Sequence, residues 1–278
     1  MKDVTIVLPA YNEAEALAKI LGELKKKYKE AQVLVVDDGS TDRTAEVARK
    51  AGVTAVSHPY NKGYGAALKT GARAAKTEYV LYFDSDGQFF TDDINAVAAE
   101  RNKYDMVIGA RPKEFTMKDM GRRVMKAMAS YLSGKKIPDI NCGFRLIRRQ
   151  RVLDFMSILP DGFSFTTTIT LAMLQAGDSV KFQPVRVKPR ESGKSGIKKM
   201  RHGLRFMLYI LRMVMLFNPL KVFLPVSLAL FAVGFPVFAY FLLFQAHVSQ
   251  TSLMLILFSL MTFLFGLVAD AISVLVRK

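Results

Sequence analysis

The sequence predicts an α/β domain with a mostly parallel sheet, followed by a two-helix hairpin in a membrane. Strand-like and helix-like segments alternate through residues 1–110, which is typical of parallel strands joined by covering helices. Near the C-terminus, residues 222–244 contain no charge and residues 253–276 contain one, Asp270. Each of these two segments is long enough to cross a hydrocarbon core of about 30 Å.

The predicted elements of the sheet domain follow one another with short connections. Runs rich in Val, Ile and Leu predict strands at 4–10, 32–38, 53–59, 79–84 and 105–110. The segments between them predict helices at 14–28, 41–52, 63–76 and 92–104. Ser40, Thr41 or Asp42 can cap the second of these helices. We expect the sheet domain to occupy residues 1–196.

Residues 197–217 predict a different kind of helix. Apolar residues recur there at roughly helical spacing, and Lys and Arg side chains lie among them. Such a helix can lie in the membrane interface, although an ordinary amphipathic helix docked on the domain would show the same pattern. The hairpin is then expected to occupy residues 218–278, with the polar sequence QAHVSQTS between its helices.

The net charge of +16 is concentrated in the middle of the chain. Residues 101–217 carry 24 Lys and Arg against 8 Asp and Glu, whereas residues 1–100 have a net charge of −2. A basic block beside apolar segments favours an anionic membrane surface over nucleic acid. By the positive-inside rule, we expect an integral membrane protein whose N-terminal domain and both termini are cytoplasmic. The single cysteine, Cys142, excludes an intrachain disulfide.

Polar residues follow four of the predicted strands at the point where each strand ends. These residues are Pro9 to Glu13, Asp37 to Ser40, Asp84 to Asp86, and Arg111. In a mostly parallel sheet, ligands bind beyond the carboxyl ends of the strands. The polar residues therefore predict a binding site at that edge of the sheet.

The stretch FDSDGQ predicts a metal site within this edge. Asp84 and Asp86 are two residues apart, so their side chains share a face in extended chain. Two carboxylates with Gln88 close behind suit a hard divalent cation, because Mg²⁺ takes one or two carboxylates and completes its shell with water and substrate phosphates. A tight turn is the alternative for the same residues, but their place at a strand end favours the metal.

Two neighbouring segments are open to more than one interpretation. Asp37 or Asp38, at the end of a strand, can accept hydrogen bonds from a ribose or a base edge, or can cap the next helix. Lys62 and the glycines that follow it can bring the backbone close to a phosphate, although their spacing is not that of a Walker A loop. A simple entry into a helix is an equal alternative for this second segment.

A series of short motifs gives the sequence a family resemblance. The motifs are LPAYNE at 8–13, VVDDGSTDRT at 35–44, NKGYGAALKTG at 61–71, FDSDGQ at 83–88, IGAR at 108–111 and DINCGFRLIRR at 139–149. Together, and in this order, they resemble the family 2 glycosyltransferases of the GT-A fold. Within that family the chain is similar to the polyprenyl-phosphate glycosyltransferases, the group that includes dolichol-phosphate mannose synthase. The two apolar C-terminal segments match a common bacterial layout in this group.

The resemblance implies a UDP- or GDP-linked sugar donor and a bound Mg²⁺ or Mn²⁺. The residues implied to bind the nucleotide are Pro9, Tyr11, Glu13, Asp38, Lys62 and Asp84. Those implied to hold the metal are Asp84, Asp86 and Gln88. The acceptor would be undecaprenyl or dolichyl monophosphate, and the residues implied to face its phosphate are Arg111, Arg122, Arg123, Arg145 and Ser195. Arg145 has a structural role as an equal alternative.

The segment PRESGKSG resembles the part of the family that closes over the phosphates. Its residues implied in that role are Arg190, Ser192, Lys194 and Ser195, and the residues expected to act in catalysis are Asp86, Arg111, Arg190 and Lys194. A phosphate monoester has a second pKa near 6, so the acceptor is an anion near neutral pH and needs no catalytic base. Metal and guanidinium groups can stabilise charge on the leaving oxygens. The implied reaction is an inverting transfer of one sugar.

The chain departs from the family pattern at two places. Ser85 stands where the family often has alanine, and its side chain is expected to point away from the two acids. Residues 162–174 carry threonines where some relatives carry an acid. If that acid were an obligatory base, activity would be in doubt, but an acceptor that is already an anion does not require one.

Two other functions share parts of this pattern. A polysaccharide synthase with a glycan acceptor resembles the chain in its N-terminal motifs but uses a QxxRW segment, and this chain contains no tryptophan. A catalytically silent, membrane-tethered nucleotide-binding module would not need Asp84, Asp86 and Gln88. The expected partners are the donor, the lipid acceptor, the bilayer and a second copy in a homo-oligomer, with a lipid-sugar flippase or a downstream glycosyltransferase as candidates. No nucleic-acid partner is expected.

Overall fold

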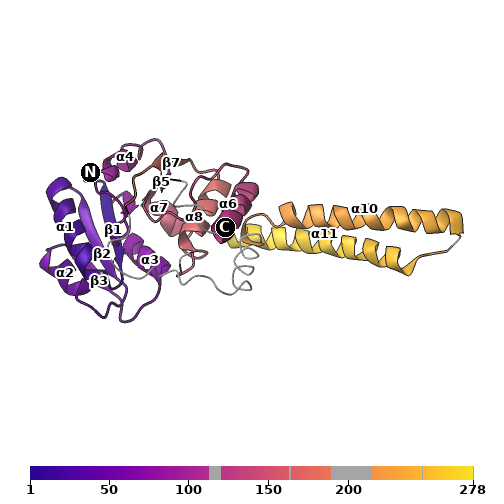
Figure 1. Ribbon diagram of the computed structural model, residues 1–278, viewed down its shortest axis with the longest axis horizontal. Coiled ribbons are helices and arrows are strands. Elements are labelled where there is room, and N and C mark those ends of the chain that lie inside the picture. Colours follow the sequence, from indigo (N-terminus) through magenta and orange to yellow (C-terminus); the bar gives the residue numbers. More distant parts are fainter. Residues whose placement is uncertain (113–119, 163, 189–214, 246, 278) are drawn as a thin grey trace. The chain divides into compact units, whose positions relative to one another are not determined.

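A seven-stranded sheet forms the core of the N-terminal part of the chain (Figure 1). The computed structural model describes residues 1–112, 120–162, 164–188, 215–245 and 247–277. The chain divides into two compact units, Met1–Arg201 and His202–Lys278. The strand order is β3-β2-β1-β4-β6-β5-β7. Strand β6 is antiparallel to both of its neighbours, and the other strand pairs are parallel.

The elements of the first unit follow the predicted order. The strands are β1 (Val4–Ala10), β2 (Gln32–Asp37), β3 (Thr54–Ser57), β4 (Tyr79–Tyr82), β5 (Met106–Ala110), β6 (Arg145–Arg148) and β7 (Val180–Pro184). The helices are α1 (Ala14–Lys27), α2 (Thr44–Lys50), α3 (Tyr64–Ala74), α4 (Asp93–Ala98), α6 (Met120–Ser133), α7 (Arg149–Asp154) and α8 (Phe165–Gln175). The five predicted strands and the four helices between them are all present, so the α/β class with a mostly parallel sheet is confirmed.

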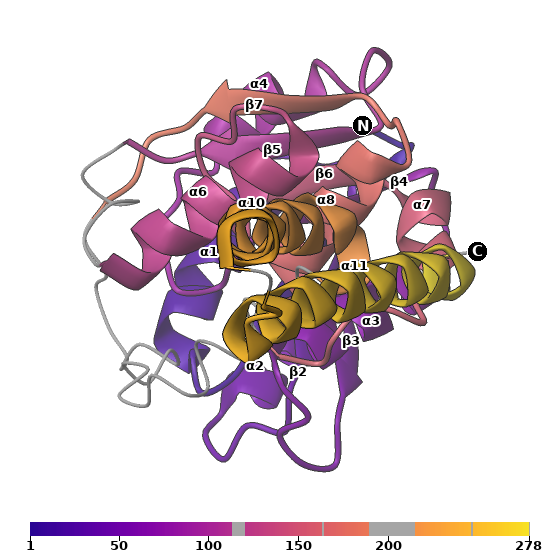
Figure 2. The same ribbon diagram turned by 90° about the vertical axis from the view of Figure 1, so that its right-hand side faces the viewer.

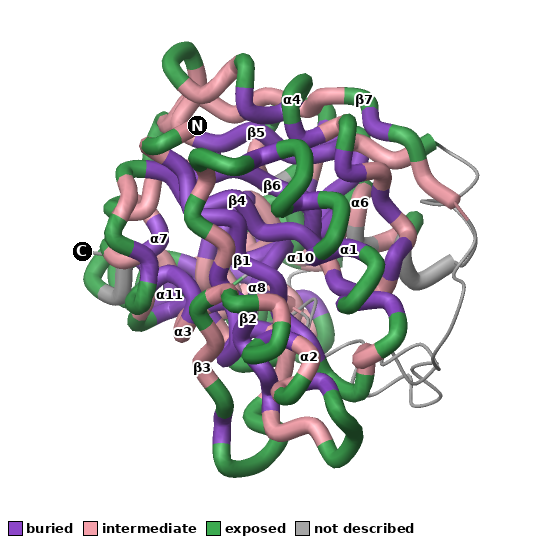
Figure 3. Tube along the Cα trace, turned by 90° about the vertical axis from the view of Figure 1, so that its left-hand side faces the viewer, coloured by how far each residue is buried: buried purple, intermediate pink, exposed green. Residues whose placement is uncertain are grey.

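The central strands are buried on both faces. All seven residues of β1 and all four of β4 are buried, and Figure 3 shows these strands in purple at the centre of the unit. Helices α1 and α2 pack together on one face, and α3 packs on the other face against β1 and β2 (Figure 1). Strands covered on both sides are continuous apolar runs, which explains why their residues do not alternate with polar ones.

The second half of the sheet carries an aromatic cluster that supports the predicted site. Strands β4, β6, β5 and β7 lie beside one another in that order, with α6 against α8 (Figure 2). Phe83, Phe89 and Phe144 pack together, with ring centroids between 5.1 and 6.1 Å apart. Phe83 and Phe89 flank residues 84–88, and each buried aromatic ring of this kind contributes about 1.5–3 kcal/mol to stability. The cluster therefore anchors both ends of the DSDGQ turn.

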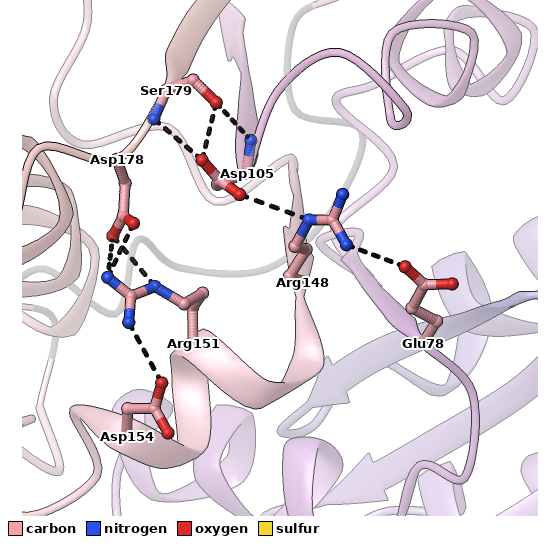
Figure 4. A network of polar contacts seen from close by, with 7 residues as sticks. All are labelled: Glu78, Asp105, Arg148, Arg151, Asp154, Asp178 and Ser179. Carbon is pink, nitrogen blue, oxygen red and sulfur yellow. Dashed lines mark hydrogen bonds and ion pairs between the residues drawn. The ribbon is translucent and has the colours of Figure 1, made fainter.

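Charged side chains join the strands at the opposite edge of the sheet, where β4, β5 and β7 begin (Figure 4). Asp105 Oδ2 accepts hydrogen bonds from the backbone N and the Oγ of Ser179 at 2.9 and 2.6 Å. Arg148, at the end of β6, pairs with Asp105 at 3.2 Å and with Glu78 at 2.9 Å. This network ties β5, β6 and β7 together away from the edge where the predicted site lies.

The second unit contains α10 (Leu220–Gln245) and α11 (Gln250–Arg277), which pack along a seam of small residues. Small buried residues recur at every seventh position of α11: Ser252, Ser259, Gly266 and Ser273. Ser259 Oγ donates to the backbone O of Ser227 at 2.8 Å across the seam. A Cβ on Gly266 would lie 2.7 Å from the Cβ of Phe223, so only glycine fits there. Small side chains allow such helices to approach closely.

Both helices have the length and composition of membrane spans. Their mean hydropathy is 2.2 over Leu220–Gln245 and 2.4 over Gln250–Leu275. The side chains that point away from the seam are large and apolar, and Leu243, Phe244 and Leu275 are at least 70% exposed. The spans predicted at 222–244 and 253–276 lie within these helices. The predicted interfacial helix at 197–217 lies almost entirely outside the described residues.

Replacing Asp105 by Asn should destabilise the first unit in a pH-dependent way. The hydrogen bond from Ser179 and the charge of Arg148 hold the pKa of Asp105 below its usual range, although partial burial opposes them. A lowered pKa in the folded state gives stability that is present above the unfolded pKa of about 3.9 and is lost as pH falls through the folded value. We expect a loss of about 1–2 kcal/mol at pH 7 that shrinks below pH 4, measured by denaturant unfolding.

The control for this prediction is Glu30→Gln. Glu30 forms only exposed ion pairs at 3.7 and 3.9 Å, which contribute about 0–1 kcal/mol. An Asp105→Asn loss that is the same at pH 7 and pH 3 would contradict the linkage.

Candidate functional site

Hydrogen bonds hold the loops after β1 and β2 together at the carboxyl edge of the sheet. The backbone N of Asn12 donates to Ser40 Oγ at 3.0 Å, and the backbone N of Glu13 donates to Thr44 Oγ1 at 3.0 Å. Asn12 itself has a φ of +53°, a conformation that asparagine tolerates better than most residues. Tyr11, beside these bonds, keeps 46% of its surface exposed. The predicted nucleotide-binding residues Tyr11 and Glu13 thus lie at the edge where a ligand can reach them.

Both carboxylate oxygens of Asp38 accept hydrogen bonds from other residues of the protein. Its Oδ1 accepts from the backbone N of Lys62 at 2.9 Å and lies 2.7 Å from His58 Nδ1, and its Oδ2 accepts from the backbone N of Gly63 at 2.9 Å. Only 3% of Asp38 is exposed. Both carboxylate oxygens of Asp38 hold the turn before α3, and the contact between Asp38 and the nucleoside stays a prediction.

The same bonds distinguish between the two interpretations of the turn at 61–63, a phosphate-binding backbone and a helix entry. The backbone N–H groups of Lys62 and Gly63 point at Asp38, and that of Ala66 donates to the backbone O of Asp161 at 3.0 Å. These donors are not available to a phosphate, so the turn is an ordinary helix entry. The side chain of Lys62 is exposed, with its Nζ 5.6 Å from the centre of the Tyr60 ring. A phosphate contact from Lys62 would come from this side chain.

The DSD turn presents Asp84 and Asp86 and buries Ser85. Tyr64 donates from its hydroxyl to Asp84 Oδ1 at 2.7 Å. The backbone N of Gln88 donates to Asp86 Oδ1 at 3.1 Å, and Gly87 between them has a φ of +75°. Ser85 Oγ donates to the backbone O of Pro9 at 2.7 Å. Ser85 therefore points into the protein, as predicted, and its bond ties β1 to the turn.

The carboxylate of Asp84 lies in an unfavourable electrostatic environment. Burial and the neighbouring charge of Asp86 raise the pKa of Asp84 to about 6, while Tyr64, Arg111 and Arg145 act in the opposite direction. Loss of water and the approach of a like charge both disfavour the ionised form. A cation placed between the two carboxylates would remove this penalty.

Arg111 is held in place by a buried acid. Its Nε donates to Asp139 Oδ2 at 2.6 Å and its Nη2 donates to Asp139 Oδ1 at 3.0 Å. Asp139 is 3% exposed, and the side chain of Arg111 is 17% exposed. Burial alone would lower the pKa of Arg111, but the hydrogen bond and the charge of Asp139, together with the charge of Asp84, raise this pKa above its ordinary value. Arg111 therefore stays charged near Asp84.

Arg145 is part of the framework and not of an open site. It is fully buried, and its guanidinium donates to the backbone O of Cys142, the backbone O of Thr166 and the Oγ1 of Thr170. Arginine that satisfies backbone oxygens in this way has no exposed donor for a ligand. The expectation that Arg145 faces the acceptor phosphate is therefore corrected to its structural alternative.

Several predicted residues cannot be placed against the site. Arg190, Ser192, Lys194 and Ser195 lie outside the described residues, as does the side chain of Arg122. Arg123 is exposed on α6. The roles given to these residues remain predictions.

Three residues that sequence reasoning did not single out complete the site. Tyr64 and Asp139 make the bonds described above. Gly143 lies against the DSD turn, and a Cβ there would overlap both carboxylate oxygens of Asp84 and the hydroxyl of Tyr64. Each of these residues lies within a quoted motif, but nothing in the spacing of the motifs indicates which of their residues meet.

The residues present fit a divalent cation that is bound partly by its substrate. Among the residues that the structure describes, no group of three or more His, Cys, Asp or Glu side chains could hold a metal ion. The pair of carboxylates in a desolvated turn suits Mg²⁺ or Mn²⁺, which can complete the shell with water and phosphate oxygens. Asp84 and Asp86 are the candidates for direct ligands, with Gln88 beside them.

Comparison with known proteins identifies the family. The family model of glycosyl transferase family 2 matches residues 5–155, more than half of the chain. The chain belongs to glycosyl transferase family 2. A second family model, the GtrB C-terminal hairpin, matches residues 218–275, the segment that contains α10 and α11. The enzyme is thus a glycosyltransferase with a C-terminal hairpin, and the two apolar helices associate it with a membrane.

Two relatives narrow the group. Glycosyltransferase AglJ of Haloferax volcanii is 30% identical over 99% of this chain and 95% of the relative. Dolichyl-phosphate beta-glucosyltransferase ALG5D of Trichomonas vaginalis is 30% identical over 52% of this chain and 53% of the relative. Together with the hairpin, they support the predicted place of this family 2 enzyme among the polyprenyl-phosphate glycosyltransferases.

A solved structure confirms the GT-A-like fold. Glucosyl-3-phosphoglycerate synthase from Mycobacterium tuberculosis, in complex with Mn²⁺ and UDP-glucose, has a TM-score of 0.61 to this glycosyltransferase at 18% identity. The match covers 74% of this chain and 78% of that one. The same synthase has also been solved with Mg²⁺ and UDP. At this level of identity the likeness concerns the fold alone.

Replacing Gly143 by Ala should weaken metal binding. The added methyl group must displace the Asp84 carboxylate or the Tyr64 hydroxyl, because their atoms occupy its place. Displacement of a group that orients a metal ligand typically lowers affinity about 10–100-fold. We expect at least the lower end of this range for Mn²⁺ in the presence of UDP, measured by calorimetry.

Gly22→Ala is the matched control, since a Cβ at Gly22 meets nothing within 4 Å. The control should bind Mn²⁺ as the wild type does and gain slightly in helix stability. Equal Mn²⁺ affinity in the two variants would show that Gly143 is not needed to seat Asp84.

Proposed function

We propose that this family 2 glycosyltransferase is a membrane-bound inverting enzyme that moves one sugar from a UDP- or GDP-sugar to a polyprenyl monophosphate. The observation that carries the proposal is the meeting of an acid pair and a fixed guanidinium at one edge of the sheet. Asp84 and Asp86 suit a metal-bound diphosphate, and Arg111 suits a second phosphate. The apolar hairpin on the same chain supports an acceptor that resides in the bilayer.

In this proposal the donor would be bound by the strand-end residues and the acid pair. Asp84, Asp86 and Gln88 would hold Mg²⁺ or Mn²⁺ on the diphosphate. The solved synthase, which has the same fold and contains both Mn²⁺ and UDP-glucose, supports this combination of metal and donor. Bound there, the metal would supply charge stabilisation for the leaving diphosphate oxygens. Tyr11 and Glu13, in the segment that follows β1, would face the nucleoside, with Pro9 before them at the end of the strand.

The acceptor supplies its own nucleophile. Transfer forms a bond from an acceptor phosphate oxygen to the anomeric carbon and breaks the bond from that carbon to the diphosphate, on opposite faces of the sugar. A phosphate monoester is already anionic near neutral pH, so the buried threonines of α8, which cannot act as a base, fit the reaction. Arg111 would grip the acceptor phosphate and offset the repulsion between the two anions.

The membrane arrangement follows the charge pattern. We infer that the hairpin spans the bilayer, with the catalytic unit and both termini on the cytoplasmic side. Five further residues remain candidates for contacts with the acceptor and the phosphates. They are Arg122 and Arg123 of α6, and Arg190, Lys194 and Ser195 after β7 in the sequence. A homo-oligomer, and a flippase or downstream glycosyltransferase that receives the lipid-linked sugar, complete the proposed partners.

The direct test is transfer to lipid phosphate in bilayer vesicles. UDP- and GDP-sugars would be combined one by one with undecaprenyl or dolichyl phosphate, and the lipid product would be identified by mass spectrometry. We expect one sugar per lipid from at least one donor, loss of activity on chelation by EDTA, and recovery with Mg²⁺ or Mn²⁺. Transfer to a glycan acceptor, with none to lipid phosphate, would contradict the proposed function.

Asp86→Ala should abolish transfer while the fold persists. The change removes one of the two carboxylates of the acid pair but leaves the aromatic cluster beneath the turn. We expect turnover to fall by about 10³-fold or more, in the range seen when a transition-state charge partner is lost. Asp154→Ala is the control, because Asp154 pairs with Arg151 in the network of Figure 4. Retained turnover of Asp86→Ala with metal present would remove Asp86 from the metal site.

A further inference from the structure

The loop from Asp139 to Arg145 contacts both halves of the proposed site. At its start, Asp139 binds Arg111 through two parallel hydrogen bonds at 2.6 and 3.0 Å. Four residues later, Gly143 lies so close to Asp84 and Tyr64 that no side chain fits between them. One short loop therefore meets the guanidinium on the acceptor side and the carboxylate on the metal side.

The loop is held rigidly from beneath. The guanidinium of Arg145 is fully buried and donates to the backbone O atoms of Ile140 and Cys142 within the loop, and to Thr166 and Thr170 of α8. The backbone N of Asn141 donates to Asp139 Oδ1 at 3.1 Å, which closes a turn at the start of the loop. Its carbonyl groups and its leading carboxylate are thus fixed by the protein.

One nitrogen of the Arg111 guanidinium, Nη1, can donate to a ligand. Asp139 takes the Nε and Nη2 donors, and no described residue accepts a hydrogen bond from Nη1. The charge of each of Arg111 and Asp84 shifts the pKa of the other, and the 139–145 loop contacts both side chains, so the two groups lie in the same part of the site. An anion that reaches Nη1 would therefore lie near the metal-side carboxylate.

We propose that Asp139 is a positioning residue that aims Arg111 at the acceptor phosphate, and that the 139–145 loop sets the separation between Arg111 and Asp84. The inference rests on the proposed polyprenyl-phosphate acceptor. Asp139 touches no substrate in this arrangement and acts through Arg111. A fixed separation keeps the nucleophilic phosphate and the leaving diphosphate in reacting distance without a reorganisation step.

The test is a double-mutant cycle of Asp139→Asn and Arg111→Lys in the full-length enzyme. Asn keeps the shape of Asp139 and an oxygen for the Asn141 turn, but it loses the charge that grips Arg111. We expect Asp139→Asn to raise the KM for polyprenyl phosphate about tenfold, as for residues that orient a ligand-binding group, with the affinity for UDP and Mn²⁺ changed less than about twofold. In the Arg111→Lys background the same change should have little further effect, because coupled residues are not additive.

Asp178→Asn is the matched control. Asp178 grips Arg151 by bonds of 2.6 to 3.1 Å at the opposite edge of the sheet (Figure 4), so it reports the effect of losing a similar pair. It should lower the unfolding temperature without changing the KM for the lipid. The inference is overturned if Asp139→Asn raises that KM no more than Asp178→Asn does, or if its effects and those of Arg111→Lys simply add. If Asp139→Asn does not fold, Asp139→Glu gives the same comparison, because it keeps the charge but moves it by one methylene group.

A binding measurement separates this inference from the proposed function. Calorimetry with citronellyl phosphate, a short water-soluble acceptor, should show weaker binding to Asp139→Asn than to the wild type in the presence of UDP and Mn²⁺. Wild-type binding without turnover contradicts the proposed reaction alone. Equal binding by wild type and Asp139→Asn, or none by either, overturns the positioning role.

Discussion

The site depends on a carboxylate, that of Asp84, which the protein has partly shielded from water. Asp84 is enclosed by the Tyr64 hydroxyl, by the bare backbone of Gly143 and by the neighbouring charge of Asp86. Such a group is stable in its ionised form only with compensating charge close by. Arg111 and Arg145 provide part of that charge, and a divalent cation would provide the rest. The aromatic cluster beneath the turn and the buried Ser85 bond to Pro9 hold the carboxylate in this position.

The two edges of the sheet serve different purposes. At the edge where the parallel strands begin, Asp105, Arg148 and Ser179 form bonds that tie strands together. At the carboxyl edge, the acid pair Asp84 and Asp86 and the guanidinium of Arg111 influence one another electrostatically. Both edges contain a bidentate arginine–aspartate pair, Arg151 with Asp178 at the first and Arg111 with Asp139 at the second. The first pair joins α7 to the start of β7, and the second lies beside the acid pair in the proposed site.

Much of the fold was predictable from the sequence, because the central strands are covered on both faces and appear as uninterrupted apolar runs. The hairpin was predictable for a similar reason, since its length and hydropathy leave few alternatives. The acid pair was predictable from its place at the end of β4. By contrast, the partners of Asp38 and Arg145 were not predictable, because the bonds join segments that are distant in the sequence. Asp38 binds Lys62 and Gly63, which lie 24 and 25 residues away. Arg145 binds Thr166, which lies 21 residues away. A strand-end acid looks the same whether it faces a ligand or its own backbone.

The glycine at position 266 has a consequence for how the two helices of the hairpin align with each other. Small residues at every seventh position of α11 would remain in phase if the two helices slid past each other by two turns. Only one alignment, however, puts the bulky ring of Phe223 over a residue without a side chain. A slide of seven residues would press that ring against Ser259 or Ser273 instead. Gly266 therefore fixes the longitudinal register of α10 against α11, and with it how far the end of each helix extends past the end of the other.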